Sequence, residues 1–180
     1  MKTPFLVGLN VYLRPLGLKD LEGNYVDWLN DPEVSANNSH HIFPYTREQA
    51  EEYIQKAYTG SSKLVLAVNL KESDVHIGNI ALQQIDFRNQ CAEFAVLFGE
   101  KDYWGKGYSK EAARLIMKHG FDSLNLRRIY CGTFAENIAM QKLADFLGFK
   151  REGVRREAFF KDGKFVDIWE YGVLRDEFVG

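Results

Sequence analysis

The sequence predicts a mixed α/β fold in which helices cover the faces of a central sheet. Hydrophobic residues make up 46% and charged residues 27% of the chain, a balance typical of a globular protein rather than a disordered one. Apolar patterns of helical and of strand period alternate along the chain, which favours mixed α/β over an all-helical or all-strand fold. No repeat, linker or low-complexity segment divides the 180 residues, so we expect one domain over residues 1–180.

The first half of the chain predicts a strand, two helices and three strands. Residues 10–14 alternate and stop at Pro15, as a strand does. A helix over 18–30 would place Leu21, Tyr25, Trp28 and Leu29 on one side. Thr46 and Gln49 form a capping box, so a second helix should begin there and end near Gly60. The three strands that follow are expected at 63–70, 76–82 and 91–98.

The second half predicts a helix, a strand, a helix and a final hairpin. The helix over 109–123 carries a stripe of small and apolar residues. The helix over 137–147 is closed by Gly148. Strands are expected at 128–133, 154–160 and 165–174, the last two joined by a turn at 161–164. Together, the strands expected in the two halves of the chain predict a sheet of about seven strands.

Composition excludes several classes of function. The formal charge of −2 and the pI near 6.1 give no basic excess for a nucleic-acid partner. No apolar run approaches the roughly 20 residues of a membrane span, and no apolar region of a signal peptide follows Met1. Cys91 and Cys131 provide neither a disulfide scaffold nor a metal site. We therefore expect a cytoplasmic protein without a metal, a nucleic-acid partner or a membrane partner.

The loop over residues 103–109 has the composition of a phosphate-binding site. Gly105 and Gly107 let the backbone curl, and the helix that follows adds positive partial charge at its first turn. Lys106, Lys110 and Arg114 add full charges nearby. The segment matches neither a Walker A loop nor a dinucleotide fingerprint. The alternative interpretation is an ordinary glycine-rich turn before a helix.

Several segments together resemble the GNAT acetyltransferases, and the closest branch looks like the RimJ/RimL-type ribosomal-protein and spermidine N-acetyltransferases. The resemblance covers nearly the whole chain. It rests on residues 92–98 followed by Asp102-Tyr103-Trp104-Gly105-Lys106-Gly107-Tyr108, on Glu136-Asn137-Ile138-Ala139, on the run from Leu147 to Gly153, and on the two ends, Tyr12-Leu13-Arg14-Pro15-Leu16 and Asp167-Ile168-Trp169-Glu170-Tyr171.

The resemblance implies a mostly antiparallel, twisted sheet with one splayed pair of strands, and acetyl-CoA as co-substrate. Backbone groups of Val96, Leu97 and Phe98 would pair with the pantetheine arm like an added strand. Asn137 would hydrogen-bond the cofactor near its thiol, although the residue could equally be a helix N-cap. The pyrophosphate would lie against Trp104, Gly105, Lys106, Gly107, Tyr108, Ser109 and Lys110.

Glu93 is the candidate catalytic base. An alkyl ammonium has a pKa near 10, so acetyl transfer needs a group that takes the proton from the amine. Glu93 lies on the strand that would reach the cofactor, between apolar neighbours that would favour its neutral form. The alternative is a strand glutamate on a solvated face. Because no activated nucleophile is evident, we expect direct transfer in a ternary complex, with a backbone N–H of the 96–98 strand polarising the thioester.

One departure from the family concerns the group that would protonate the leaving thiolate. The tyrosine that the resemblance predicts seven residues after Asn137 is Ala144 here, and an alternative serine position is Met140. Solvent would then supply the proton, or Tyr108, Tyr130 or Tyr171 would. The same departure keeps open a second function, a coenzyme A-binding sensor or regulatory module with little turnover.

The acceptor is expected to be a primary amine: a polyamine, a protein N-terminus or another small amine. The resemblance places residues 17–54 beside the acceptor, and acids outnumber bases there, which favours a cationic acceptor. Solvated helix faces would explain the same charges. His40-His41 is expected in a loop beside the acceptor rather than at a metal. A homodimer is possible.

Overall fold

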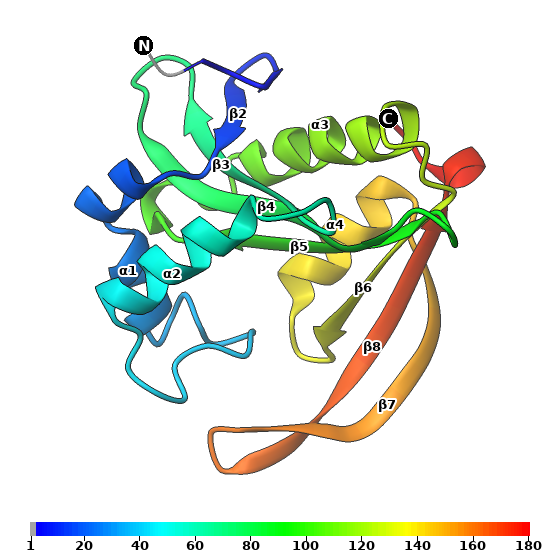
Figure 1. The fold of residues 1–180 in the computed structure, drawn as a ribbon. Coiled ribbons are helices and arrows are strands. Elements are labelled where there is room, and N and C mark those ends of the chain that lie inside the picture. Colours follow the sequence, from blue (N-terminus) through cyan, green and yellow to red (C-terminus); the bar gives the residue numbers. More distant parts are fainter. Residues whose placement is uncertain (1–2) are drawn as a thin grey trace.

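The computed structural model describes residues 3–180, so Met1 and Lys2, the start of the segment expected not to be a signal peptide, lie outside the described residues. One sheet of eight strands runs through this part of the chain (Figure 1). Its strands are β1 (Leu6–Val7), β2 (Val11–Pro15), β3 (Leu64–Leu70), β4 (His76–Asp86), β5 (Cys91–Phe98), β6 (Arg128–Phe134), β7 (Lys150–Lys161) and β8 (Lys164–Leu174).

The sheet is antiparallel except at one place. Its order is β1-β2-β3-β4-β5-β6-β8-β7, and β5 and β6 form the parallel pair. The α-helices are α1 (Tyr25–Asn30), α2 (Arg47–Ala57), α3 (Tyr108–Asp122) and α4 (Ile138–Leu147). Short 3₁₀ turns are η1 (Leu18–Glu22), η2 (Lys101–Tyr103) and η3 (Arg175–Glu177).

Two apolar clusters fix the helices to opposite faces of the sheet. Helices α3 and α4 share one buried cluster with Ile80, Leu82 and Phe94 of the central strands. Helices α1 and α2 share the other with Val65, Ala67 and Ala81. Side chains alternate between faces along a strand, so even-numbered residues of β5 point toward α3 and α4 and odd-numbered ones toward α1 and α2. Glu93 is therefore on the α1–α2 side.

Most of the expected elements are confirmed, and the exceptions have local causes. Thr46 caps α2, because its hydroxyl accepts from the Gln49 N–H while the Gln49 amide accepts from the Thr46 N–H. The expected single helix over 18–30 is wrong: η1 ends at Glu22 with Gly23 as its C-cap, and α1 begins after Asn24. Glycine and asparagine are poor helix formers, which explains the break. The expected seven strands become eight through β1, and β7 begins at Lys150 rather than Val154.

Candidate active site

A wedge opens in the sheet between β5 and β6. The two strands pair at Cys91–Arg128, Ala92–Ile129 and Glu93–Tyr130, and no further. β5 nevertheless continues beside β4 as far as Phe98, which faces Gly78. The edge of β5 that faces β6 is therefore free of a strand partner beyond Glu93. This is the splayed pair that the sequence resemblance implied.

Backbone groups along this open edge alternate in direction. The Leu97 carbonyl points to β4, since a Cβ added at Gly78 would lie 2.5 Å from its oxygen. The Phe98 carbonyl points the other way and accepts from the Trp104 indole Nε1–H at 2.9 Å. N–H and C=O groups switch edges at every residue of a strand, so the main-chain groups of Val96 also face the wedge. Of the three expected residues, Val96 thus has the backbone best placed to bind a ligand, while the Leu97 backbone faces β4.

Two adjoining cavities meet at this edge. The smaller one has a volume of about 320 Å³ and lies between the end of β5, the 103–109 loop and α4. The larger one has a volume of about 780 Å³ and extends over the α1–α2 side of β4 and β5. Both are lined by Asn37, Asn38, Val96, Leu97, Asn137 and Met140.

The smaller cavity collects nearly all the residues expected to bind the cofactor. The exceptions are Lys106 and Lys110, which are exposed beside it. Those that line it are Val96, Leu97, Phe98, Trp104, Gly105, Gly107, Tyr108, Ser109 and Asn137. Gly105 and Gly107 have φ of +73° and +87°, conformations that side chains rarely adopt, so the loop depends on its two glycines.

Three cations belong to the glycine loop and to the first turns of α3 that follow it. The Lys106 ammonium lies 5.2 Å from the centre of the Tyr103 ring. The Lys110 ammonium and the Arg114 guanidinium lie over the Phe146 ring at 4.5 and 4.3 Å. Helix α3 begins at Tyr108, so its positive N-terminal end adds to these charges. The combination suits an anionic ligand such as a pyrophosphate.

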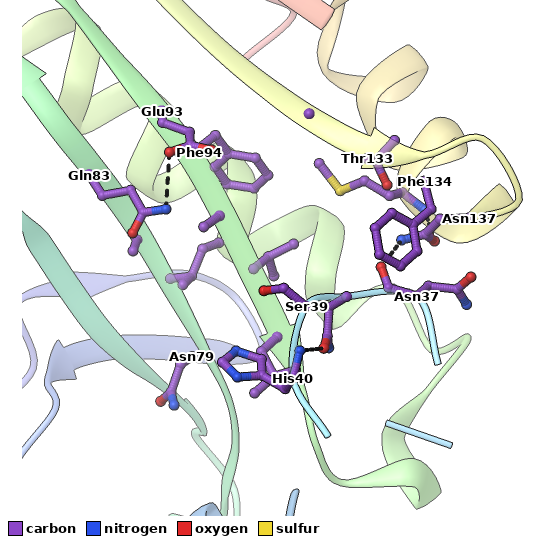
Figure 2. Close-up of a pocket in the computed structure, with 18 of the residues that line it drawn as sticks. Asn37, Ser39, His40, Asn79, Gln83, Glu93, Phe94, Thr133, Phe134 and Asn137 are labelled. Carbon is purple, nitrogen blue, oxygen red and sulfur yellow. Dashed lines mark hydrogen bonds between the residues drawn. The ribbon is translucent and has the colours of Figure 1, made fainter. Parts of the chain in front are cut away.

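Asn137 bridges the two cavities and caps a helix. Its Oδ1 accepts from the Met140 N–H at 3.0 Å, which confirms the N-cap interpretation for α4. Its Nδ2 donates to the Asn37 carbonyl at 3.4 Å, across to the loop that covers both cavities (Figure 2). The capping role occupies the oxygen, so the amide nitrogen is the atom that can turn to a ligand.

Glu93 lies on the floor of the larger cavity in a polar setting. Its Oε2 accepts from the side-chain amide of Gln83 at 3.2 Å (Figure 2) and from that of Gln84 at 2.7 Å. The apolar surroundings expected from its sequence neighbours are therefore wrong, because Phe94 and Val96 point to the opposite face of the sheet. The two amides fix the carboxylate while leaving it open to a proton donor in the cavity.

The larger cavity is also lined by residues that sequence patterns did not single out. Tyr25, Tyr45 and Tyr53 form an aromatic end. Burial raises the pKa of Tyr45 and Tyr53, so both hydroxyls are neutral in the physiological range. At the other end the Arg155 Nε donates to the Glu170 carboxylate at 2.5 Å. These residues come from distant segments, and no local spacing indicates that they meet.

The remaining candidates for proton transfer lie in different places: some line a cavity, and others are buried in the core. Ala144 is fully buried in the core on the α3–α4 side and lines neither cavity, so that position does not face the reaction site. Met140 lines both cavities. Tyr130 lines the larger one and Tyr108 the smaller, whereas Tyr171 is buried away from both.

Of the neighbouring His40 and His41, only His40 lines the larger cavity, and neither cysteine lines it. Burial raises the pKa of the Cys131 thiol to about 12, and Cys91 and Cys131 are both free thiols. Within residues 3–180, no group of three or more His, Cys, Asp or Glu side chains is arranged to hold a metal ion. Across the same residues, no helix is both long and apolar enough to span a membrane.

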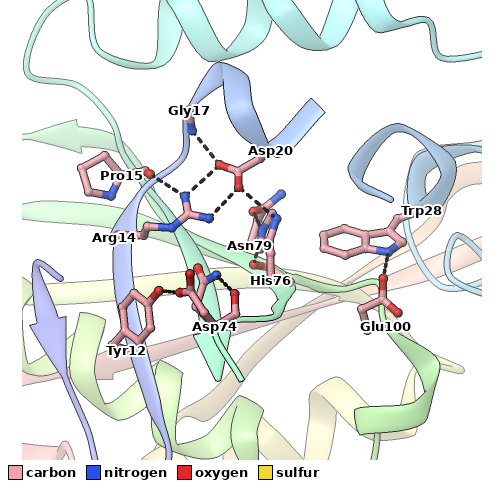
Figure 3. Close-up of polar contacts among 12 residues, drawn as sticks. Tyr12, Arg14, Pro15, Gly17, Asp20, Trp28, Asp74, His76, Asn79 and Glu100 are labelled. Carbon is pink, nitrogen blue, oxygen red and sulfur yellow. Dashed lines mark hydrogen bonds and ion pairs between the residues drawn. The ribbon is translucent and has the colours of Figure 1, made fainter. Parts of the chain in front are cut away.

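The acids of residues 17–54 do not line the larger cavity. Asp20 is buried in a two-point ion pair with Arg14, at 2.8 and 2.6 Å (Figure 3). Asp31 and Glu33 share the Lys101 ammonium, each at 2.9 Å. These residues therefore do not form the acidic rim that the sequence predicted at this cavity.

The chain belongs to the GNAT acetyltransferase family: the model of the acetyltransferase (GNAT) domain matches residues 10–150. This confirms the family and the enzyme class expected from the sequence, an N-acetyltransferase that uses acetyl-CoA.

The chain is similar to several N-acetyltransferases along most of its length. It is 32% identical to the "Uncharacterized N-acetyltransferase p20" of Bacillus licheniformis, over 93% of this chain and 94% of that one. It is 25% identical to a spermidine N(1)-acetyltransferase of Vibrio cholerae, over 81% and 87% of the two chains. The fold matches the crystal structure of a spermidine N-acetyltransferase from Vibrio cholerae in complex with CoA and spermine, with a TM-score of 0.84 at 23% identity over 93% and 97%.

Proposed function

We propose that this protein transfers the acetyl group of acetyl-CoA directly to a primary amine where its two cavities meet. The observation that carries the proposal is the shared wall, in which Val96, Leu97, Asn137 and Met140 line both cavities. A co-substrate in the smaller cavity and an amine in the larger one would meet at the open edge of β5. Holding both reactants at one edge supplies proximity, which accounts for a large part of the rate in such reactions.

The glycine loop, the start of α3 and the lysines beside the smaller cavity suit the pyrophosphate of coenzyme A. The pyrophosphate would lie at the glycine loop and the start of α3, close to Lys106 and Lys110. The amide-rich pantetheine arm would extend along β5 and pair with the Val96 backbone. The Val96 N–H would then donate to the thioester oxygen as negative charge develops on it.

Glu93 would take the proton from the amine. It lies three residues before Val96 on β5, which corresponds to about 10 Å along a strand, so the proton would pass through water. The ammonium first gives one proton to Glu93 through water, and the free amine nitrogen then forms a bond to the acetyl carbon while the carbon–sulfur bond breaks. The nitrogen loses its second proton to solvent, and the thiolate takes a proton from solvent. Met140 and Ala144, at the two positions where the resemblance would place the acid, can supply none.

The competing function is a coenzyme A-binding module with little turnover. Thiol release from acetyl-CoA, measured with a panel of primary amines, separates the two. We expect release that requires an amine, with acetylated amine formed in equal amount. Binding of coenzyme A without release for any amine would favour the binding module. Release of one equivalent of coenzyme A before any amine is added would show an acyl-enzyme and contradict direct transfer.

A further inference from the structure

The charges that line the larger cavity nearly cancel. Among the described residues that line it, the ionisable acids and bases are His40, Glu93, Arg155 and Glu170. Arg155 and Glu170 pair with each other. Lys161 adds a further cation close by, since its ammonium donates to the carbonyl oxygen of the cavity-lining His40 at 2.7 Å. Glu93 is thus the one carboxylate of this lining without a cation paired to it, and its hydrogen-bond donors are neutral amides.

Acids elsewhere on the same side of the sheet do not line the larger cavity. Asp20 is neutralised by Arg14 in the interior, and Asp31 and Glu33 share the single Lys101 cation. Glu52 pairs with Lys56 on the exposed side of α2. A ligand with several ammonium groups would find in the cavity one carboxylate without a paired cation, Glu93, and the Lys161 ammonium close by. Burying its additional charges without partners would cost free energy.

The rest of the lining offers neutral hydrogen-bonding groups and aromatic rings. The amides that line it are Asn37, Asn38, Asn79, Gln83, Gln84 and Asn137, and the phenols are Tyr25, Tyr45, Tyr53 and Tyr130. Side-chain amides both donate and accept, so they suit hydroxyl and amide groups of a ligand.

The Asn79 amide is held in a defined orientation. The His76 Nε2 lies 2.9 Å from the Gly78 carbonyl oxygen and 2.8 Å from the Asn79 Oδ1 (Figure 3). Because both neighbours are oxygens, Nε2 must carry the hydrogen and donate. The Asn79 oxygen is thereby occupied, and its NH₂ group remains to donate to a ligand. Asn79 faces Leu97 and Glu93 faces Gln83, so the two side chains lie about 13 Å apart along the floor of the cavity.

We infer that the acceptor is a small molecule with a single ammonium group on an uncharged body rich in hydroxyl or amide groups, rather than a polyamine. The ammonium pairs with Glu93, and the body extends toward Asn79 and the tyrosines. This inference rests on the proposed function for its chemistry, but it concerns binding and is therefore open to a separate test.

The test compares acceptors of different charge. The probes are spermidine, glucosamine and the dipeptide amide Ser-Ala-NH₂, whose only charge is its α-ammonium group, each assayed for acetylation at two salt concentrations. Glucosamine or Ser-Ala-NH₂ should exceed spermidine in kcat/KM by about tenfold or more, with a shallow dependence on salt. A higher kcat/KM for spermidine than for both single-amine probes would overturn the inference.

A binding measurement separates this inference from the proposed function. Calorimetry with the coenzyme A-saturated protein measures the affinity for each probe without any reaction. If no probe is acetylated, the proposed function fails, and the order of affinities still decides the acceptor class. Tighter binding of spermidine than of both single-amine probes would contradict the inference there too.

A pair of variants at Ser39 tests the charge argument within one scaffold. Ser39 lines the cavity on an exposed loop (Figure 2). Ser39→Asp adds a carboxylate, and Ser39→Asn has nearly the same shape without the charge. The ratio of spermidine affinity to glucosamine affinity should be several-fold higher in Ser39→Asp than in Ser39→Asn. Equal ratios in the two variants would show that charge does not limit polyamine binding here, against the inference.

Discussion

A glutamate at Gly107 should abolish most of the affinity for coenzyme A while leaving the fold intact. Gly107 has a φ of +87°, and nothing lies within 4 Å of the place where a Cβ would be added. The substitution therefore meets no clash, and its cost in stability is the left-handed backbone, about 1–2 kcal/mol. In a domain of this size that corresponds to a fall in melting temperature of several degrees.

The effect on binding follows from charge. The new carboxylate would lie roughly 5 Å from the pyrophosphate, where two unit charges repel by about 3 kcal/mol at an effective dielectric constant of about 20. Affinity should fall by about 100-fold. Isothermal titration calorimetry with coenzyme A measures the loss directly, and Gly107→Gln separates the charge from the bulk of the side chain.

Gly163 provides the matched control. It has a φ of +82° and equally open surroundings, but it lies in the turn between β7 and β8 and lines neither cavity. Gly163→Glu should lose the same stability and keep coenzyme A binding. The placement of the pyrophosphate is refuted if the two glutamate variants bind coenzyme A with affinities within threefold of each other.

Two further predictions concern residues away from the cavities. Ala144 is fully buried, so Ala144→Tyr should overpack the core and bring no gain in rate. A denaturant titration should show a free energy of unfolding lower by about 1–3 kcal/mol. A faster enzyme of unchanged stability would show that this position faces the thiolate. Burial raises the pKa of the Cys131 thiol to about 12, so iodoacetamide at pH 8 should label the half-buried Cys91 and spare Cys131 in the folded protein. Mass spectrometry identifies the labelled cysteine, and preferential labelling of Cys131 would contradict its burial.

Local sequence patterns predicted the strands, caps and loops whose structure is determined by residues that are neighbours along the chain. The strand Cys91–Phe98 agrees with the structure at both ends, because its nearly continuous apolar run, typical of a strand covered on both faces, is bounded by Gln90 and Gly99. The glycine loop was recognisable because its groups are contiguous. The break at Gly23 and Asn24 was missed, since the apolar spacing continues through it and only the two weak helix formers indicate it.

Features that depend on the packing of distant segments could not be predicted from local sequence patterns. The seven-residue spacing from Asn137 to Ala144 does not tell how α4 is rotated against the sheet, and the structure turns Ala144 into the core. The polar setting of Glu93 comes from Gln83 and Gln84 on a neighbouring strand. The ion pairs that neutralise Asp20 and Asp31 join residues of different elements, so the acid count of residues 17–54 misrepresented the charge of the cavity.

The pH–rate profile of Glu93→Gln tests the proposed mechanism most directly. The variant keeps the shape of the side chain and removes the base, and Glu170→Gln is the control because it alters the other carboxylate of the same cavity. With the best amine found, Glu93→Gln should be slower by about 100-fold near neutral pH and should recover toward high pH, where the amine loses its proton unaided. Glu170→Gln should keep the form of the wild-type profile. Identical profiles for the wild type and Glu93→Gln would contradict the assignment of Glu93 as the base.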